Sequence, residues 1–312
     1  MELPLYFGLF VIALAALLWA SDKFIDSAEA IGLSLGISPF IIGVTIVAFG
    51  TSLPELATSI SAVLEGDSKI VVGNVVGSNI TNIALVLGLV AVAVKQIDLD
   101  YNVWHIDMPY LWGSAFFLYF VLMDFHLSVF ECLLFITAII IFLAYSFKGD
   151  EEREQQEKIK TTWRSYVMLL IGGIGVAAGA HFTIEAITQL SLMANIDSDV
   201  ISLSAVALGT SLPEVIVSLN AARKGKTSIA VGNVLGSNIF NTYCVMAIPG
   251  LMGTLEIPTD ILTFSLPLMI VMTVLFGIMS SNKKITRWEG MVLLLFYLFF
   301  IVDLFSRTLN PA

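Results

Sequence analysis

The sequence predicts an all-α membrane protein with ten transmembrane helices, arranged as two five-helix repeats of inverted topology. Three observations predict this fold class: an apolar composition, ten apolar segments of membrane-crossing length, and a two-part motif that occurs twice. Hydrophobic residues make up 57% of the 312 residues and charged residues only 13%. Water would not keep such a chain folded and monomeric, so we expect it in a bilayer.

The apolar segments are long enough for helices. A helix needs about 20 apolar residues to cross roughly 30 Å of hydrocarbon. Such segments span residues 4–27, 40–65, 70–94, 104–123, 127–146, 164–190, 199–222, 228–251, 260–279 and 286–306. They lack the strict alternation of barrel strands. The first is expected to be a retained helix, since the chain start has neither a basic region nor a cleavage site.

The repeat is visible in the letters of the chain. GTSLPE occupies positions 50–55 and returns at 209–214, and GNVVGSNI at 73–80 returns as GNVLGSNI at 232–239. Both parts are offset by 159 positions (209 − 50 and 232 − 73). The spacing within each copy is therefore kept, which indicates a duplicated structural unit.

The distribution of Lys and Arg predicts the topology. When successive loops are assigned to alternate sides, one side holds only Lys69 and Arg307. The other holds Lys23, Lys95, Lys148, Arg153, Lys158, Lys160, Arg164, Arg223, Lys224, Lys226, Lys283, Lys284 and Arg287. The basic side should face the cytoplasm, with both termini outside. The GTSLPE helices are the second and the seventh, so they cross in opposite directions. The expected domains are a first repeat (1–148), a cytoplasmic linker (149–163) and an inverted second repeat (164–312).

The prolines of the motif predict breaks in these helices. Pro54 has no N–H for the carbonyl of Gly50, and Pro213 likewise leaves the carbonyl of Gly209 without its helical donor. In hydrocarbon such oxygens must be satisfied by protein, water or an ion. We expect broken second, third, seventh and eighth helices. Inverted repeats with interrupted helices at matching positions are typical of secondary transporters.

A carboxylate stands beside each break. Glu55 and Glu214 have no basic residue in their own motif, and a charge at the bilayer centre costs on the order of 3 kcal/mol or more. Either they are protonated or a cation is their partner. Hydroxyls and amides at helical spacing accompany them: Thr51, Asn74, Ser78 and Asn82, and in the second copy Thr210, Asn233, Ser237 and Asn241. For each of these neutral residues, helix packing is the alternative interpretation.

The chemistry of the motif selects hard cations. Every candidate ligand is an oxygen, which favours Ca²⁺, Na⁺ or Mg²⁺ over zinc or copper. Mg²⁺ gives up its waters reluctantly, so a dehydrated cage suits Ca²⁺ better. An enzyme is not expected, because the spans contain no nucleophile and base pair, zinc motif or paired catalytic aspartates.

With these residues the chain resembles the cation/calcium antiporter superfamily, and most closely its prokaryotic sodium/calcium exchanger branch. The resemblance covers essentially the whole chain. It implies exchange of Ca²⁺ for Na⁺, three Na⁺ per Ca²⁺, by alternating access. The transported Ca²⁺ and Na⁺ are substrates, and no cofactor is expected.

The resemblance also assigns metal ligands. Calcium would lie between Glu55 and Glu214 with the main-chain oxygens of Thr51 and Thr210. The other positions implied are one sodium site of Ala48, Thr51, Glu55 and Ser78, its mate of Ala207, Thr210, Glu214 and Ser237, and a middle position among Glu55, Asn82, Glu214 and Asn241. Ser52 and Ser211 of the same motif complete the candidate metal-binding set.

One position departs from the family pattern. Well-characterised relatives carry an aspartate where this chain has Asn241, so the site holds two carboxylates instead of three. We hypothesise that Asn241, which imitates a protonated acid, reduces the proton sensitivity of exchange.

The resemblance implies motion of the first and sixth helices, which would slide across a rigid core. Asp22, Asp26, Glu29 and Glu185 lie toward span ends and are expected at the membrane interface. The lipid bilayer is the expected partner, with no nucleic acid. A monomer would suffice, although the sequence leaves the oligomeric state open. A prokaryotic inner membrane is the expected location. The alternatives are an H⁺/Ca²⁺ antiporter and, from another class, a passive cation channel.

Overall fold

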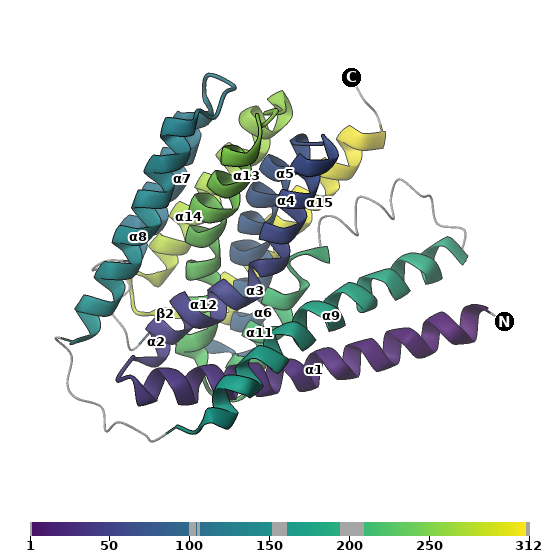
Figure 1. The fold of residues 1–312 in the computed structure, drawn as a ribbon, viewed down its shortest axis with the longest axis vertical. Helices are drawn as coiled ribbons and strands as arrows, with labels where there is room; N and C mark the ends of the chain where they lie inside the picture. The colour runs from purple at the N-terminus through teal and green to yellow at the C-terminus, as the bar shows by residue number, and fades with distance from the viewer. Residues whose placement is uncertain (1, 100–103, 105–106, 152–160, 194–208, 310–312) are drawn as a thin grey trace.

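The computed structural model describes residues 2–99, 104, 107–151, 161–193 and 209–309, and most of them are helical (Figure 1). Eight described helices are long and apolar enough to cross a membrane. They are Leu3–Ser34, Pro39–Glu65, Lys69–Val94, Val129–Phe147, Trp163–Met193, Thr227–Met252, Ile261–Ser280 and Arg287–Ser306. A ninth helix, α7 (Asp107–Leu122), occupies the fourth expected span. The seventh expected span is described only from residue 209 onward. The chain is thus a helical membrane protein with about eight to ten apolar helices.

The elements follow the expected segments closely. In the first half they are α1 (Glu2–Ser34), α2 (Pro39–Ile42), η1 (Gly43–Val47), α3 (Ala48–Thr51), α4 (Leu53–Glu65), α5 (Lys69–Ile80), η2 (Thr81–Leu87), α6 (Gly88–Val94), β1 (Gln96–Asp98), α7 and α8 (Val129–Glu151). In the second half they are α9 (Trp163–Met193), α11 (Leu212–Arg223), α12 (Thr227–Phe240), η3 (Asn241–Val245), α13 (Met246–Met252), η4 (Ile261–Ser265), α14 (Leu266–Ser280), β2 (Lys284–Thr286) and α15 (Arg287–Leu309).

Local sequence explains where several helices begin and end. The helix from Leu53 stops at Gly66, whose φ of 84° is the left-handed conformation that glycine adopts without strain. Ser128 and Glu131 form a capping box at the start of α8, where the Glu131 carboxylate accepts from the Ser128 N–H at 2.8 Å. Thr286 and Glu289 repeat this arrangement at the start of α15.

A short two-stranded antiparallel sheet joins the two halves. Strand β1 pairs with β2, with Ile97 opposite Ile285 and Asp98 opposite Lys284. The sequence pattern gave no sign of this sheet, because three residues are too few for a strand periodicity. It ties the end of α6 to the start of α15.

Helices α1 and α9 form a pair that runs obliquely beside the upright bundle of the remaining helices (Figure 1). Their backbones approach closely because α9 presents glycines. A Cβ added at Gly172 would lie 2.9 Å from the Phe24 backbone, and one at Gly179 would lie 2.8 Å from the Leu17 Cβ. Small residues permit such contact between membrane helices. The two helices therefore form one tightly packed unit.

Inside the bundle, α12 packs against α2 and η1 by direct backbone contact. A Cβ at Gly232 would collide with the carbonyl oxygen of Phe40, and one at Gly236 with that of Val44. The glycines of the GNxxGSNI motif thus allow close backbone approach in the second copy. In the first copy, a Cβ at Gly77 would meet no atom within 4 Å in the described part of the chain.

The helix interruptions differ from those expected. The second helix does break, at Ser52, but the third runs without a break from Lys69 to Val94 and the eighth from Thr227 to Met252. Each contains a π-helical segment instead, η2 and η3, whose residues keep right-handed helical backbone angles at their ends. No proline occurs in residues 69–94, and in the eighth helix the wider turn η3 directly precedes the turn that contains Pro249.

We predict that Gly236→Ala destabilises the protein by about 1–3 kcal/mol, because the added methyl overlaps the Val44 carbonyl and the helices must separate. Thermal unfolding of the detergent-purified protein measures this. Gly113→Ala is the matched control, since Gly113 is an exposed helix residue with nothing within 4 Å of an added Cβ, and it should be neutral or slightly stabilising. Equal midpoints for the two variants would contradict the packing.

Candidate ion-binding site

The two GTSLPE motifs adopt the same backbone. Ser52 and Ser211 interrupt the helix with φ, ψ angles of −88°, 4° and −84°, 1°. A new helix begins at the next residue in each copy, with proline at one of its first two positions and Glu55 or Glu214 in its first turn. Proline is tolerated there because its missing N–H needs no helical acceptor. The start of a helix also favours a carboxylate over a neutral side chain.

Both carboxylates are fully buried. Glu55 and Glu214 have no exposed surface, and their charges are close enough to repel each other. The ion pairs found in the described residues involve neither of them. Two buried, mutually repelling acids without a basic partner are costly unless they bind protons or a cation.

Several buried oxygens in this region accept no hydrogen bond from the described residues. They include both carboxylate oxygens of Glu55, Oε2 of Glu214 and the amide oxygens of Asn82 and Asn241. The hydroxyl of Ser211 is likewise without a bond. Native proteins satisfy nearly all buried polar atoms. A group of unsatisfied acceptors around two carboxylates is the arrangement that a dehydrated cation would complete.

The fourth carboxylate oxygen of the two acids, Oε1 of Glu214, accepts a hydrogen bond from the other repeat. The Ser52 hydroxyl donates to Oε1 of Glu214 at 3.1 Å, and the side chains of Thr51 and Ser237 also contact Glu214. Residues from both motif copies therefore surround one carboxylate. This places Ser52, Thr51, Ser237 and Glu214 in one cluster.

The polar contacts group the threonines differently from the expected sodium sites. The Thr51 hydroxyl donates to Oδ1 of Asn233 at 3.1 Å and lies 3.4 Å from the Ser237 hydroxyl. We expected Thr51 to share a sodium site with Ala48, Glu55 and Ser78, and that grouping stays a prediction. The hydrogen-bonding contacts of Thr51 cross between the halves, to Asn233 and Ser237 of the other copy.

The second copy shows the mirror arrangement. The Thr210 hydroxyl donates to Oδ1 of Asn74 at 3.1 Å and lies 3.5 Å from the Ser78 hydroxyl. Asn74 also donates to the main-chain oxygen of Glu55 at 3.0 Å, which fixes the backbone that carries this acid. A cavity of about 170 Å³, lined in part by Asn74, Ser78 and Asp260, reaches this cluster.

A pair of asparagines that sequence reasoning did not assign joins the two halves at the centre. Asn79 donates to the main-chain oxygen of Asn238 at 3.4 Å, and Asn238 donates to that of Asn79 at 3.3 Å. Asn82 adds a bond to Oδ1 of Asn238 at 3.0 Å. The signal was present, since both residues occupy equivalent positions of the repeated GNxxGSNI motif.

The structure says less about the remaining candidate ligands, which are Ala48, Ala207, Asn82 and Asn241. The main-chain oxygen of Ala48 accepts from the Ser52 N–H at 3.0 Å and lies 3.3 Å from the Thr51 hydroxyl. Its equivalent, Ala207, lies outside the described residues. Asn82 and Asn241 both lie in the first turn of a π-helical segment, η2 or η3. Such segments often occur at functional positions.

The arrangement has the chemistry of a hard-cation site. It consists of two carboxylates surrounded by hydroxyl and amide oxygens, and the described residues contain no group of three or more His, Cys, Asp or Glu that could hold a metal ion. Oxygen-only ligands suit Ca²⁺ and Na⁺. Fold and site together define a multi-pass membrane protein with an intramembrane cation-binding centre.

The chain belongs to the sodium/calcium exchanger protein family, whose model matches residues 5–148 and 164–305. This family is one of transporters rather than enzymes, and its substrates are Na⁺ and Ca²⁺. The chain is accordingly a multi-pass integral membrane protein of an antiporter family, as the resemblance predicted.

Relatives match over nearly their whole length. The sodium/calcium exchanger MaX1 of Methanosarcina acetivorans is 33% identical, with 96% of this chain and 98% of the relative covered. The inner membrane protein YrbG of Escherichia coli is 29% identical, with 92% of each covered. Among solved structures, the sodium-calcium exchanger NCX_Mj is similar with a TM-score of 0.85 and 33% identity, covering 97% of this chain and 99% of that one.

Proposed function

We propose that the protein is a secondary antiporter that exchanges Ca²⁺ for Na⁺ across the membrane by alternating access. The observation that carries the proposal is the pair of fully buried carboxylates, Glu55 and Glu214, with three oxygens that accept no bond from the described residues. Membership of the exchanger family and similarity to an exchanger solved with Na⁺ and with Ca²⁺ support the choice of ions.

Calcium would bind between the two carboxylates, aided by the main-chain oxygens of Thr51 and Thr210. Sodium ions would bind in the two crossed clusters. One cluster is Thr51 with Ser237, and the other is Thr210 with Ser78. Asn82 and Asn241 would line the middle position, with Ser52 and Ser211 at its edge.

The two negative charges of the site support competition between Ca²⁺ and Na⁺, but they do not fix the number of Na⁺ exchanged per Ca²⁺. Two carboxylates neutralise one Ca²⁺, whereas three Na⁺ would leave the occupied site with one positive charge. We propose three Na⁺ per Ca²⁺. Because the two occupied states differ in charge, the cycle would then move net charge and respond to membrane voltage.

The same proposal includes the architecture of ten spans in two inverted repeats, residues 1–148 and 164–312, with the linker 149–163 between them. Equivalent contacts offset by 159 positions support it. Asn74 donates to Ser59 at 3.0 Å, and Asn233 donates to Ser218 at 2.9 Å. We place the basic side in the cytoplasm and both termini outside, in a prokaryotic inner membrane. Oligomerisation is not required by this scheme.

A proton/calcium antiporter is the nearest alternative, because buried carboxylates can carry protons as well as metal ions. It would take up Ca²⁺ under a pH gradient without Na⁺. A passive cation channel would conduct without obligatory counter-transport. The two buried acids are compatible with all three functions. The ion gradient that drives Ca²⁺ uptake distinguishes between them.

We predict that Glu55→Gln and Glu214→Gln each lower sodium-driven Ca²⁺ uptake at least about 100-fold, because an amide removes one of the two charged ligands in a low-dielectric site. The measurement uses purified protein in vesicles, with radiolabelled Ca²⁺ outside and Na⁺ inside. Glu65→Gln is the control, since Glu65 is an exposed residue on the helix of Glu55, and its side chain accepts a bond from Ser61 of the same helix.

Uptake that survives in both variants would overturn the site assignment. Uptake driven by a pH gradient in the absence of Na⁺ would instead favour the proton antiporter. Uptake without any imposed gradient of either ion, balanced only by charge flow, would favour a channel.

We predict that Asn241→Asp makes exchange more sensitive to acid. The substitution adds a third carboxylate beside two existing ones, and like charges raise the tendency of one of them to bind a proton. The pH profile of sodium-driven uptake should fall at a higher pH than in the wild type. An unchanged profile would contradict the hypothesis that Asn241 reduces proton sensitivity.

A further inference from the structure

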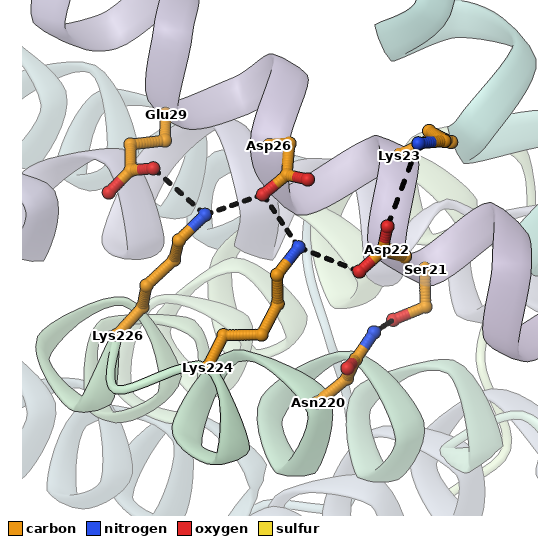
Figure 2. Close-up of polar contacts among 8 residues, drawn as sticks. All are labelled: Ser21, Asp22, Lys23, Asp26, Glu29, Asn220, Lys224 and Lys226. Carbon is orange, nitrogen blue, oxygen red and sulfur yellow. Dashed lines mark hydrogen bonds and ion pairs between the residues drawn. The ribbon is translucent and has the colours of Figure 1, made fainter.

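Three acids form a stripe along one face of α1. Asp22, Asp26 and Glu29 are spaced by four and three residues, which brings them to the same side of a helix. Two lysines face them from the turn between α11 and α12, namely Lys224 and Lys226 (Figure 2). The sequence predicted these acids at the membrane interface, with no partner assigned to them.

Each lysine bridges two successive acids. The Lys224 ammonium lies 2.7 Å from a carboxylate oxygen of Asp22 and 2.7 Å from one of Asp26. The Lys226 ammonium lies 2.6 Å from the same oxygen of Asp26 and 2.8 Å from Glu29 (Figure 2). We call these five residues the ion-pair ladder. Asp26 lies at its centre and pairs with both lysines.

The ladder joins the oblique helix pair to the helices that carry the ion site. Helix α11 begins with the break that positions Glu214, and α12 carries Asn233 and Ser237. The lysines lie in the turn between these two helices. Any displacement of α1 relative to this turn must therefore change the ladder.

Helix α1 moves together with α9 if it moves, because their backbones are in contact at Gly172 and Gly179. Toward the bundle, its other polar contact among the described residues is a single bond from Asn220 to the Ser21 hydroxyl, at 3.1 Å. Phe24 provides apolar contact, since its ring covers Gly50. Apolar surfaces set no precise register along the helix axis, whereas ion pairs and hydrogen bonds do.

The spacing of the acids defines the consequence of sliding. The stripe from residue 22 to residue 29 spans about 10 Å, and one helical turn is about 5.4 Å. A one-turn shift in one direction would bring Lys224 between Asp26 and Glu29 and carry Lys226 past the end of the stripe. A shift the other way would bring Lys226 between Asp22 and Asp26 and place Lys224 between Leu18 and Asp22. The first shift strips Lys226 of its acids and the second leaves Lys224 with Asp22 alone, so either shift loses ion pairs.

We propose that the ion-pair ladder is a register latch, which holds the α1–α9 pair in the present position and offers a weaker, less completely paired position one turn away. The inference rests on the proposed alternating access, for which it supplies a restoring contact between the moving pair and the ion-binding helices. One-turn displacements between packed elements are a known form of switching.

Lys224 is suited to this role because it stays charged. Burial lowers the pKa of the Lys224 ammonium, but the hydrogen bonds and charges of Asp22 and Asp26 outweigh it, and its pKa lies above the ordinary value. Stabilisation by such a group is complete at neutral pH and is lost only as the pH rises through that raised pKa.

The test measures the register directly. Spin labels at Leu18→Cys on α1 and Leu64→Cys on α4, two exposed positions, report the displacement of α1 by pulsed distance measurement, with the buried Cys132 and Cys244 replaced by alanine. Asp26→Asn removes the carboxylate charge that both lysines share and leaves every basic residue in place. We expect it to raise the population of a second distance about three- to tenfold, as does Lys224→Gln with Lys226→Gln.

Two controls separate the latch from general charge effects. Lys23→Gln removes a partly exposed lysine whose only ion pair among the described residues is a 3.8 Å contact with Asp22 on its own helix, and it should leave the distances unchanged. Lys224→Arg with Lys226→Arg keeps the charges and should retain the wild-type distribution. If Asp26→Asn and the double glutamine variant give the same distances as Lys23→Gln, the latch is refuted.

The same variants distinguish this inference from the proposed function. A shifted distance distribution together with a changed maximal exchange rate and unchanged ion KM supports the latch in its transport role. If the distances shift but the protein exchanges neither Na⁺ nor H⁺ for Ca²⁺, the ladder still sets the helix register. The proposed antiport function is then refuted. Unshifted distances in an active exchanger would refute the latch alone.

Discussion

The structure depends on one electrostatic constraint: two carboxylates, Glu55 and Glu214, are buried side by side without a basic partner in the described chain. Removing a charge from water costs several kcal/mol even after relaxation, and repulsion between like charges adds to this. A fold that retains such a pair needs a mobile cation or proton to complete it. Transport follows from the same fact, because a ligand that is required for charge balance can be exchanged only for another cation.

The surrounding architecture holds this pair in place from both halves. Ser52 of the first motif bonds Glu214 of the second, and Asn74 fixes the backbone of Glu55. The reciprocal bonds of Asn79 and Asn238 join the two motif helices at their centre. Backbone contact at Gly236 brings α12, which carries Ser237 and Asn238, directly against Val44 of η1. The ion-pair ladder then links this core to the helix pair beside it.

Much of this was predictable from the sequence. Segment lengths gave the helices to within a few residues, and Pro54 and Pro213 gave the breaks, because a missing N–H acts locally. The two acids could be identified because charge in an apolar segment is costly wherever the chain folds. The repeat itself could be read directly from the matching letters.

What the sequence did not predict depends on relations between distant segments. The contact of Thr51 with Ser237 follows from how the halves interlock, which a linear motif does not contain. No sequence pattern predicts the π-helical turns at Asn82 and Asn241. We therefore predicted breaks where the helices only widen. The partners of Asp26 lie about 200 positions away, as Lys226 shows. Such contacts are determined by packing and not by local propensity.

Equilibrium binding of ⁴⁵Ca²⁺ to the purified protein, without Na⁺ and with increasing Na⁺, tests the central claim most directly. The account predicts one saturable Ca²⁺ per chain, displaced cooperatively by Na⁺ and absent when Glu55 and Glu214 are both replaced by glutamine. Saturable Ca²⁺ binding that persists in the double variant, or that Na⁺ leaves unchanged, would contradict it.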